Sequence, residues 1–528
     1  MNDLQVVTAT RKRRRHLRFG CLKDATVKIG DFNIRSRVRD ASTAGVCLEI
    51  EENHPLRPGA QVTLDWNSMA EVNGSKSSER CLISGTVVRI GGLKNASQAY
   101  GIRFQRLVHE QLTLASSRLQ KFGVACAAAL LAVVICFLKV NNLLYFWYDP
   151  WLQAYSVAAA AFVLSRIVLS FFYKEPPDEG YFPTATIVIA GKNEEAHIAE
   201  TIHHCFRAYY PPDLLDVIAI DDGSTDKTWE AMEALQAQYP RLRIFRFEKN
   251  KGKRHAMALG AQEAVGEFLV YVDSDSYIAP DSLYRILQPF KSKKIGAVSG
   301  HVLAAVEPDN FISKMESVRY YVSHRVMKAA ESVFGAVTCC PGAFSAYRRS
   351  AVLEAIPSWL NQTFMGTPAT FGDDRSLTNY LLRSYQVIYH AGAVCLTYTP
   401  RTWMQFLRQQ LRWKKSWARE TTVAVRLMYR KHPVAALSYY LGIVITLISP
   451  LVALWALVVL PLLTSASFLP YLTGVFLVYL FLCLIYLYHT RSRYWYYGLA
   501  FAGLYICILS LQNYYAIATM RKNHWGTR

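Results

Sequence analysis

Two pairs of aspartates each follow a short apolar run. Asp221-Asp222 comes directly after Val217–Ile220, and Asp273 and Asp275 come directly after Phe268–Val272. Residues i and i+2 of an extended segment point to the same side, so Asp273 and Asp275 can converge on one cation. Mg²⁺ or Mn²⁺ held by one or two carboxylates takes its remaining ligands from water and substrate phosphates. A single Asp-x-Asp is more often a turn or a helix cap, but two acidic pairs together indicate a nucleotide-phosphate site.

The elements that would position these carboxylates run from Thr184 to about Pro400. In this region short, largely apolar segments alternate with helical stretches, a pattern typical of a doubly wound α/β sheet with its functional groups at the carboxyl ends of the strands. The predicted strands are Ile187–Ala190, Val217–Ile220, Ile244–Phe247 and Phe268–Val272. Further along, Ile312, Met315, Val318, Val322 and Val326 recur at helical spacing and are predicted to be core residues.

Further motifs complete a resemblance to a known family. Phe371-Gly372-Asp373-Asp374 carries a third acidic pair, and Gln409–Trp413 reads Gln-x-x-Arg-Trp. With the two earlier pairs, in this order, the chain from about Thr184 to Arg528 resembles the processive family 2 glycosyltransferases. It is most similar to the hyaluronan synthases, and after them to the nodulation chitin-oligosaccharide synthases. The resemblance includes the terminal residues Trp525–Arg528. The resemblance implies a GT-A-like catalytic domain that transfers sugars from UDP-sugar donors to a nascent polysaccharide.

The resemblance also implies roles for individual residues. Asp374, with Asp373 beside it, would be catalytic and remove the proton from the attacking acceptor hydroxyl, which inverts the anomeric carbon. The cation on Asp275, assisted by Asp273, and the charge of Arg412 would stabilise the leaving diphosphate. The expected donor and acceptor contacts are Asp221, Asp222, Asp273, Lys253, Arg254, Gln409, Arg412 and Trp413. For Lys253 and Arg254, a solvated turn is nearly as good an interpretation.

One segment departs from the hyaluronan synthases. Pro341-Gly342 stands where those enzymes have Gly-Pro, in a segment that lies near the acceptor sugar in the family. The polymer, hyaluronan-like or chitin-like, therefore stays open. The alternative functions are a single-transfer enzyme that makes a glycolipid, and a non-catalytic membrane receptor. A glycosidase, which also uses paired carboxylates, would not need the Asp-x-Asp metal site or Arg412.

The first 118 residues carry a second set of residues able to bind a ligand. Arg11–Arg18 holds six Lys and Arg, and it is followed by Asp40-x-Ser42-x-x-Gly45. Short alternating runs then predict strands separated by Gly, Pro, Asn and Asp, as in a small β-barrel. These runs are Ala25–Ile29, Gly45–Ile50, Gln61–Trp66, Leu82–Ile90 and Tyr100–Phe104.

This combination resembles a PilZ domain, a family that binds cyclic di-GMP. Arginine suits that ligand because its guanidinium can pair with phosphate and with the O6 and N7 atoms of guanine. The paired arginines would be Arg14 and Arg18, with Arg11 and Arg15 as the alternative register. Asp40 and Ser42 would contact the other guanine edges, and Gly45 would leave room for the ligand. Cyclic di-GMP is expected to relieve a block of the active-site mouth.

Charge and hydropathy separate the chain into zones. The net charge is +20 and the apolar fraction is 52%, which favours a membrane protein with basic surfaces or a nucleic-acid binder. Phe122–Leu138 and Trp151–Phe172 are close to the ~20 residues of a full span. Arg401–Lys431 has nine Lys and Arg against one acidic residue, interleaved with aromatic residues, and predicts helices lying in the membrane interface. The basic surfaces are thereby assigned to lipid and nucleotides, and DNA and RNA are not expected partners.

The predicted architecture is a multidomain membrane protein. A PilZ-like barrel (1–118) precedes two transmembrane helices (119–176), a catalytic domain (177–400), interfacial helices (401–432) and C-terminal transmembrane helices with a cytoplasmic tail (433–528). Eleven scattered cysteines without a CxxC pair favour a reducing compartment. We expect a multi-pass protein of the bacterial inner membrane with both domains in the cytoplasm. To keep the basic tail there, the apolar residues from Pro433 would need an extra short or broken span, split at Pro450.

Overall fold

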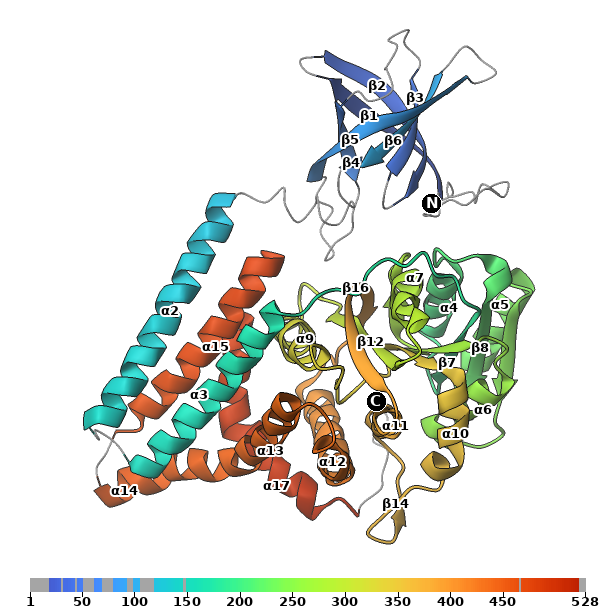
Figure 1. Cartoon of the computed structure of the whole chain (residues 1–528). Helices are drawn as coiled ribbons and strands as arrows, with labels where there is room; N and C mark the ends of the chain where they lie inside the picture. The colour runs from blue at the N-terminus through green and yellow to red at the C-terminus, as the bar shows by residue number, and fades with distance from the viewer. Residues whose placement is uncertain are drawn as a thin grey trace. The chain divides into compact units, whose positions relative to one another are not determined.

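The structure, a computed structural model, describes residues 19–29, 32–42, 45–50, 61–68, 79–92, 98–104, 118–145, 149–464 and 467–521, with side chains in 122–138, 149–464 and 467–521. The chain forms two compact units, 1–126 and 127–528. In Figure 1 the strands of the first unit are blue, and the second unit runs from cyan to red.

The first unit is a closed β-barrel, as the alternating runs predicted. Its strands hydrogen-bond in the order β1-β2-β3-β6-β5-β4. They are β1 (Phe19–Ile29), β2 (Phe32–Ser42), β3 (Gly45–Ile50), β4 (Gln61–Ser68), β5 (Glu79–Gly92) and β6 (Gln98–Phe104). The described neighbours are antiparallel, and closure leaves no strand edge among them unpaired.

The second unit is built around an eight-stranded sheet, ordered β11-β16-β12-β13-β10-β7-β8-β9. Its strands are β7 (Ala185–Gly191), β8 (Leu215–Asp221), β9 (Leu242–Arg246), β10 (Phe268–Asp273), β11 (Ser276–Ile278), β12 (Ile295–Ala304), β13 (Phe344–Arg348) and β16 (Gln386–Thr397). The four predicted strands are β7 to β10, and they are parallel to their neighbours within that group. The other half is mixed, because β13 lies antiparallel between β10 and β12.

Helices cover both faces of this sheet, since alternate strand residues are buried on opposite sides. Ile187 and Ile189 belong to one core cluster and Val188 to the other. The first face carries α4 (Ile198–Phe206), α5 (Thr228–Gln238) and α7 (Ser282–Leu287). The second face carries α6 (Lys253–Glu263), α9 (Ala329–Ser332), α10 (Arg349–Leu360), α11 (Asp373–Leu382) and the end of α12 (Trp403–Met428). The predicted interfacial region is thus mainly one 26-residue helix, α12.

Four described helices are long and apolar enough to cross a membrane. They are α3 (Pro150–Phe171), the continuous helix Pro433–Thr464 that begins with α13 (Pro433–Leu454) and ends with α14 (Leu460–Thr464), α15 (Leu469–Thr490), and Tyr497–Ala518, which contains α16 (Tyr497–Leu504) and α17 (Ser510–Ala518). The helix α2 (Arg118–Tyr145) holds the shorter apolar stretch Phe122–Leu138. The prediction of a break at Pro450 is wrong, because α13 continues through this proline.

Helix α8 (Phe311–Val322) joins the catalytic part to the membrane helices. Ile312 and Met315 pack with Phe406 of α12 and Leu509 near α17, and Val318 packs with Cys483 of α15. The apolar residues predicted from helical spacing are therefore core residues, as expected, except that Val322 is only half-buried. After α8 the helix continues as a π-helical segment, Ser323–Lys328.

Candidate active site

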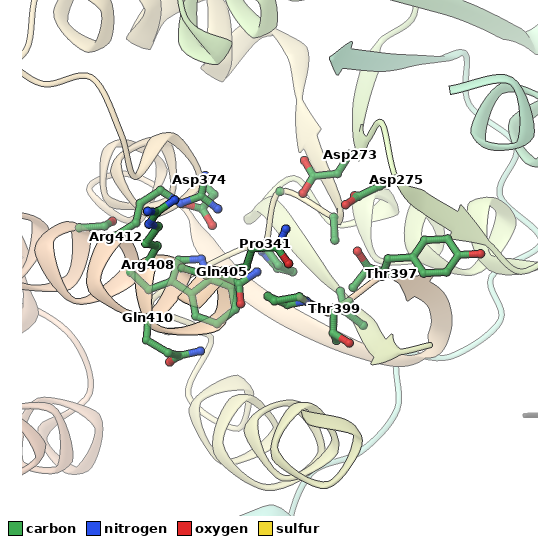
Figure 2. A pocket seen from close by; sticks show the side chains of 18 of the residues that line it. Asp273, Asp275, Pro341, Asp374, Thr397, Thr399, Gln405, Arg408, Gln410 and Arg412 are labelled. Atoms are coloured by element: carbon green, nitrogen blue, oxygen red, sulfur yellow. The ribbon is translucent and has the colours of Figure 1, made fainter. Parts of the chain in front are cut away.

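One cavity of about 1030 Å³ brings together most of the residues that the sequence singled out. Its wall includes strand-end carboxylates, Asp374 of the Gly-Asp-Asp motif, and residues of α12 and of the membrane helices. The predicted residues that line it are Asp222, Lys253, Asp273, Asp275, Asp374, Gln409, Arg412 and Trp413. Figure 2 shows Asp273 and Asp275 on one part of the wall, and Asp374 and Arg412 on another.

Asp273 and Asp275 lie where β10 ends, as predicted for parallel strands. Lys253, the first residue of α6, donates a hydrogen bond from Nζ to Asp273 Oδ1. Burial lowers the pKa of Lys253, but the charge of Asp273 outweighs it and holds the pKa above its ordinary value. Gly342 packs on this pair, and a Cβ there would lie 3.0 Å from Asp273 Oδ1.

This donor set fits a hard divalent cation. Carboxylate oxygens are the ligands that Mg²⁺ and Mn²⁺ prefer. Among the described residues no group of three His, Cys, Asp or Glu side chains could hold a metal ion. Asp273 and Asp275, which both line the cavity, would supply the protein's share of the ligands, and a diphosphate and water would supply the rest.

The two residues of the first acidic pair, Asp221 and Asp222, have different surroundings. Asp222 lines the cavity and accepts hydrogen bonds from the backbone N–H groups of Lys251 (2.8 Å) and Gly252 (2.9 Å). Burial raises the pKa of Asp222 above its ordinary value. Asp221 is buried outside the cavity wall, where it accepts from Ser224 N at 3.0 Å and pairs with Arg246 Nε at 3.1 Å. Asp221 therefore holds the turn that presents Asp222.

In the Gly-Asp-Asp motif, too, one aspartate lines the cavity and the other is buried outside its wall. Asp374 lines the cavity, and its Oδ1 accepts from the N–H of Arg375 at 2.8 Å. The thiol of Cys339 lies 3.8 Å from Asp374 Oδ2, and burial together with the charge of Asp374 raises the pKa of Cys339 to about 11. Asp373 is instead buried in an ion pair with Arg254, whose Nε lies 2.8 Å from Asp373 Oδ1. Neither Asp373 nor Arg254 lines the cavity.

The Gln-x-x-Arg-Trp motif lies on α12, which begins with a capping box at Thr402. Arg412 and Trp413 both line the cavity. The Trp413 ring lies 5.0 Å from the guanidinium carbon of Arg319 and 6.4 Å from the Tyr320 ring, both on α8. Contacts with α8 thus fix the orientation of Trp413. Gln409 lines the cavity with a buried Oε1 that has no hydrogen-bond partner in the described part of the chain.

Several cavity residues were missed by the sequence reasoning. His324 and Lys328 come from the π-helical segment, Thr397 is the last residue of β16, and Thr399 follows two residues later. The sequence carries no motif for them, although a basic and aromatic helix just before Cys339 could have drawn attention to the first two.

The cavity also reaches membrane helices. Thr446 of α13, and Tyr505 and Asn513 of the last membrane helix, belong to its wall. Lys414 of α12 donates to Asn513 Oδ1 at 2.7 Å and so joins α12 to α17 at this end. The adjacent amides Gln512 and Asn513 in a mostly apolar segment were the available signal.

Of the predicted cyclic di-GMP residues, Arg11, Arg14, Arg15 and Arg18 lie outside the described residues. Asp40 and Ser42 are in β2, and Gly45 begins β3. The register places Asp40 opposite Gly20 of β1, and Ser42 opposite Gly45. These three positions therefore meet at one end of the β2–β3 hairpin, next to the start of β1.

Comparison with known proteins identifies both parts of the chain. Residues 186–355 match the family described as glycosyl transferase family 2, and residues 12–118 match the PilZ domain. Among solved structures, a mannosyltransferase from Pyrobaculum calidifontis in complex with GDP-Man and Mn²⁺ superimposes with a TM-score of 0.48 at 22% identity, covering 68% of this chain and 99% of that one.

Relatives of known activity extend the similarity beyond the matched domains. The hyaluronan synthase of Streptococcus pyogenes is 31% identical over 291 residues, which are 54% of this chain and 68% of that protein. An N-acetylglucosaminyltransferase of Rhizobium meliloti is 32% identical over 266 residues, which are 50% of this chain and 62% of that protein. The chain therefore belongs to the processive family 2 glycosyltransferases, to which the hyaluronan synthases belong, and it carries an N-terminal PilZ domain.

Proposed function

We propose that this chain is a cyclic di-GMP-activated polysaccharide synthase that takes sugars from UDP-sugar donors, inverts the anomeric carbon and extrudes the polymer through the membrane. The observation that carries the proposal is the single cavity. It holds Asp273 and Asp275 on one part of its wall, and Thr446 and Asn513 of the membrane helices on another. A chain lengthened at Asp374 would have a polar path toward the bilayer.

The proposed chemistry follows from the cavity wall. An acceptor hydroxyl next to Asp374 would lose its proton to that carboxylate as it attacks the anomeric carbon. Arg412 would stabilise the negative charge that develops on the diphosphate. A divalent cation on Asp273 and Asp275, when bound, would supply further charge stabilisation. Trp413 offers a flat face to the acceptor sugar, and Asp222 lies where the nucleotide would be held.

Location and regulation form the rest of the proposal. Both domains are placed on the cytoplasmic side of the bacterial inner membrane, where nucleotide sugars and cyclic di-GMP are available. The hyaluronan synthase and N-acetylglucosaminyltransferase relatives support a hyaluronan-like or chitin-like product.

A donor panel tests the function. Purified full-length protein in lipid nanodiscs is incubated with radiolabelled UDP-GlcNAc, UDP-GlcA and UDP-Glc, singly and in pairs, with and without cyclic di-GMP. We expect high-molecular-weight product that increases with cyclic di-GMP. A labelled product that stays lipid-soluble and of low mass would indicate the single-transfer alternative. Cyclic di-GMP binding without UDP release from any donor would indicate a receptor.

The role of Asp374 has its own test. Asp374→Asn keeps the size of the side chain but removes the base, so polymer formation should fall by about 10³-fold. Binding of UDP, measured by calorimetry, should change less than about threefold, because Asp222, Asp273 and Asp275 are untouched. Substantial residual synthesis by the Asn variant would remove Asp374 as the base.

A further inference from the structure

A buried network of four charged side chains, none of which lines the cavity, surrounds the Gly-Asp-Asp turn. It consists of Arg254, Asp373, Arg419 and Glu420, which are each 1 to 5% exposed. Arg254 pairs with Asp373 at 2.8 Å, and Arg419 Nε pairs with Glu420 Oε1 at 2.9 Å. The four charges cancel, as charges removed from water must.

Gln362 joins the two ion pairs. Its Oε1 accepts from Arg254 Nη1 at 3.1 Å and from Ser376 Oγ at 2.7 Å, and its Nε2 donates to Glu420 Oε1 at 3.0 Å. Glu420 also accepts from Asn379 Nδ2 at 3.2 Å. Since Ser376 and Asn379 are on α11, the network ties α6, α11 and α12 together.

Arg419 also contacts the Gly-Asp-Asp turn directly. Its Nη2 donates to the carbonyl oxygen of Phe371, and its guanidinium carbon lies 4.8 Å from the centre of the Phe371 ring. Gly372 follows with a positive φ of 76°, and a Cβ there would lie 2.0 Å from Ser416 Oγ of α12. The backbone that carries Asp374 therefore lies directly against α12.

We propose that Arg419 and Glu420 are positioning residues, which hold the Gly-Asp-Asp turn on α12 so that Asp374 stays in register with Arg412 and Trp413. This inference rests on the proposed function. Arg412 and Trp413 lie about two turns before Arg419 on the same helix, so one rigid element places both the turn and the motif. Asp373 and Arg254 complete the support, and neither is required to touch substrate.

The network predicts which kinetic constant should change. Misplacing a catalytic group by about 1 Å can cost about 10²-fold in rate. Donor binding depends on Asp222, Asp273 and Asp275, which are outside the network. Loss of the network should therefore lower kcat and leave KM for the donor nearly unchanged.

Arg419→Lys tests this, because it keeps the charge but cannot bond Glu420 and Phe371 through a planar fork. The matched control is Arg426→Lys, an exposed residue on the same helix. We expect kcat to fall at least about tenfold in Arg419→Lys, with KM for each donor and the UDP affinity within about threefold of wild type, and no change in the control. Unchanged kcat, or a loss that appears wholly in KM, would overturn the proposal.

A second variant covers the case in which Arg419→Lys fails to fold. Gln362→Met removes the link between the ion pairs while both pairs remain, and Gln362 is only half-buried. A drop in kcat of about three- to tenfold at unchanged KM supports the positioning role, and wild-type kcat contradicts it. If the wild-type protein transfers sugar and both variants keep the wild-type kcat and KM, this inference fails and the proposed function stands. Absence of transfer by wild type from every donor would end the proposed function and this inference with it.

Discussion

Asp373 and Asp374 are neighbours in the first turn of α11, yet they have different surroundings. Successive residues of a helix are turned by about 100°. Asp374 therefore lines the cavity while Asp373 pairs with Arg254. The sequence located the motif, but it could not separate the two residues, because the partner of Asp373 lies 119 positions away in the chain. Asp221 and Asp222 also have different surroundings, but there the reason is that Asp221 ends β8, and successive side chains of an extended segment point to opposite sides.

Gly372 offers a sharp test at a single position. Gly372→Ala places a methyl group on Ser416 and forces a left-handed conformation that costs an alanine about 1–2 kcal/mol. We expect synthesis to fall at least tenfold and the unfolding temperature to drop. Adding Ser416→Gly should restore part of the loss, because it removes the clash but not the backbone strain. No recovery in the double variant would contradict the packing contact as the cause.

Lys414 predicts a pH dependence of stability. Burial, and next the charge of Arg319, lower the pKa of Lys414 to about 8. The unfolded chain binds this proton up to its ordinary pKa of about 10.4, so between these values it holds more protons than the folded chain. Stability should therefore rise from about pH 8 to about pH 10 through this group. Unfolding temperatures of wild type and Lys414→Met, measured in detergent from pH 7 to pH 10, would check this, since the variant should lack the rise.

At the scale of elements, β7, β8 and β10 were predictable because each contains a continuous apolar run that is buried on both faces. The insertion of β13 between β10 and β12 was not, because strand order depends on partners far along the chain. Pro450 illustrates a different failure. Proline lacks only one backbone donor, and a membrane helix can absorb that loss, so the residue did not mark a helix end.

The packing of α8 between membrane helices predicts a sensitive position on α16. A Cβ on Gly498 would lie 2.6 Å from Cys483 Sγ of α15 and 2.7 Å from Val318 Cγ1 of α8. Gly498→Leu should lower stability by about 1–3 kcal/mol or more through overpacking. Gly503→Ala on the same helix is the control, because a Cβ there has no described atom within 4 Å. Equal unfolding temperatures for the two variants would argue against close packing at Gly498.

At the scale of the whole molecule, composition alone predicted the order of parts. The basic front, the apolar runs and the strand-helix region are separate zones of the sequence, and the barrel, sheet and membrane helices follow that order. The continuity of the cavity with Thr446, Tyr505 and Asn513 was not predictable. It depends on how the last membrane helix packs against α12, and single polar residues in apolar runs do not reveal that.

The PilZ domain gives a prediction for the intact chain. Cyclic di-GMP should raise the rate of synthesis in membranes, and Arg14→Ala should abolish the increase while leaving the rate without the dinucleotide unchanged. Lys12→Ala, in the same basic run but in neither arginine register, should respond like wild type. Equal synthesis with and without cyclic di-GMP would end the switch hypothesis. A response lost only in Arg11→Ala or Arg15→Ala would select the other register.

The contact between Gly372 and Ser416 also constrains how this chain can evolve. Ser416 occupies the space that a Cβ at 372 would need, so position 372 cannot gain a side chain unless residue 416 changes with it. Across descendants of this sequence the two positions should therefore vary jointly or remain fixed together. A lineage that placed a side chain at 372 would have had to remodel residue 416 of α12 at the same time.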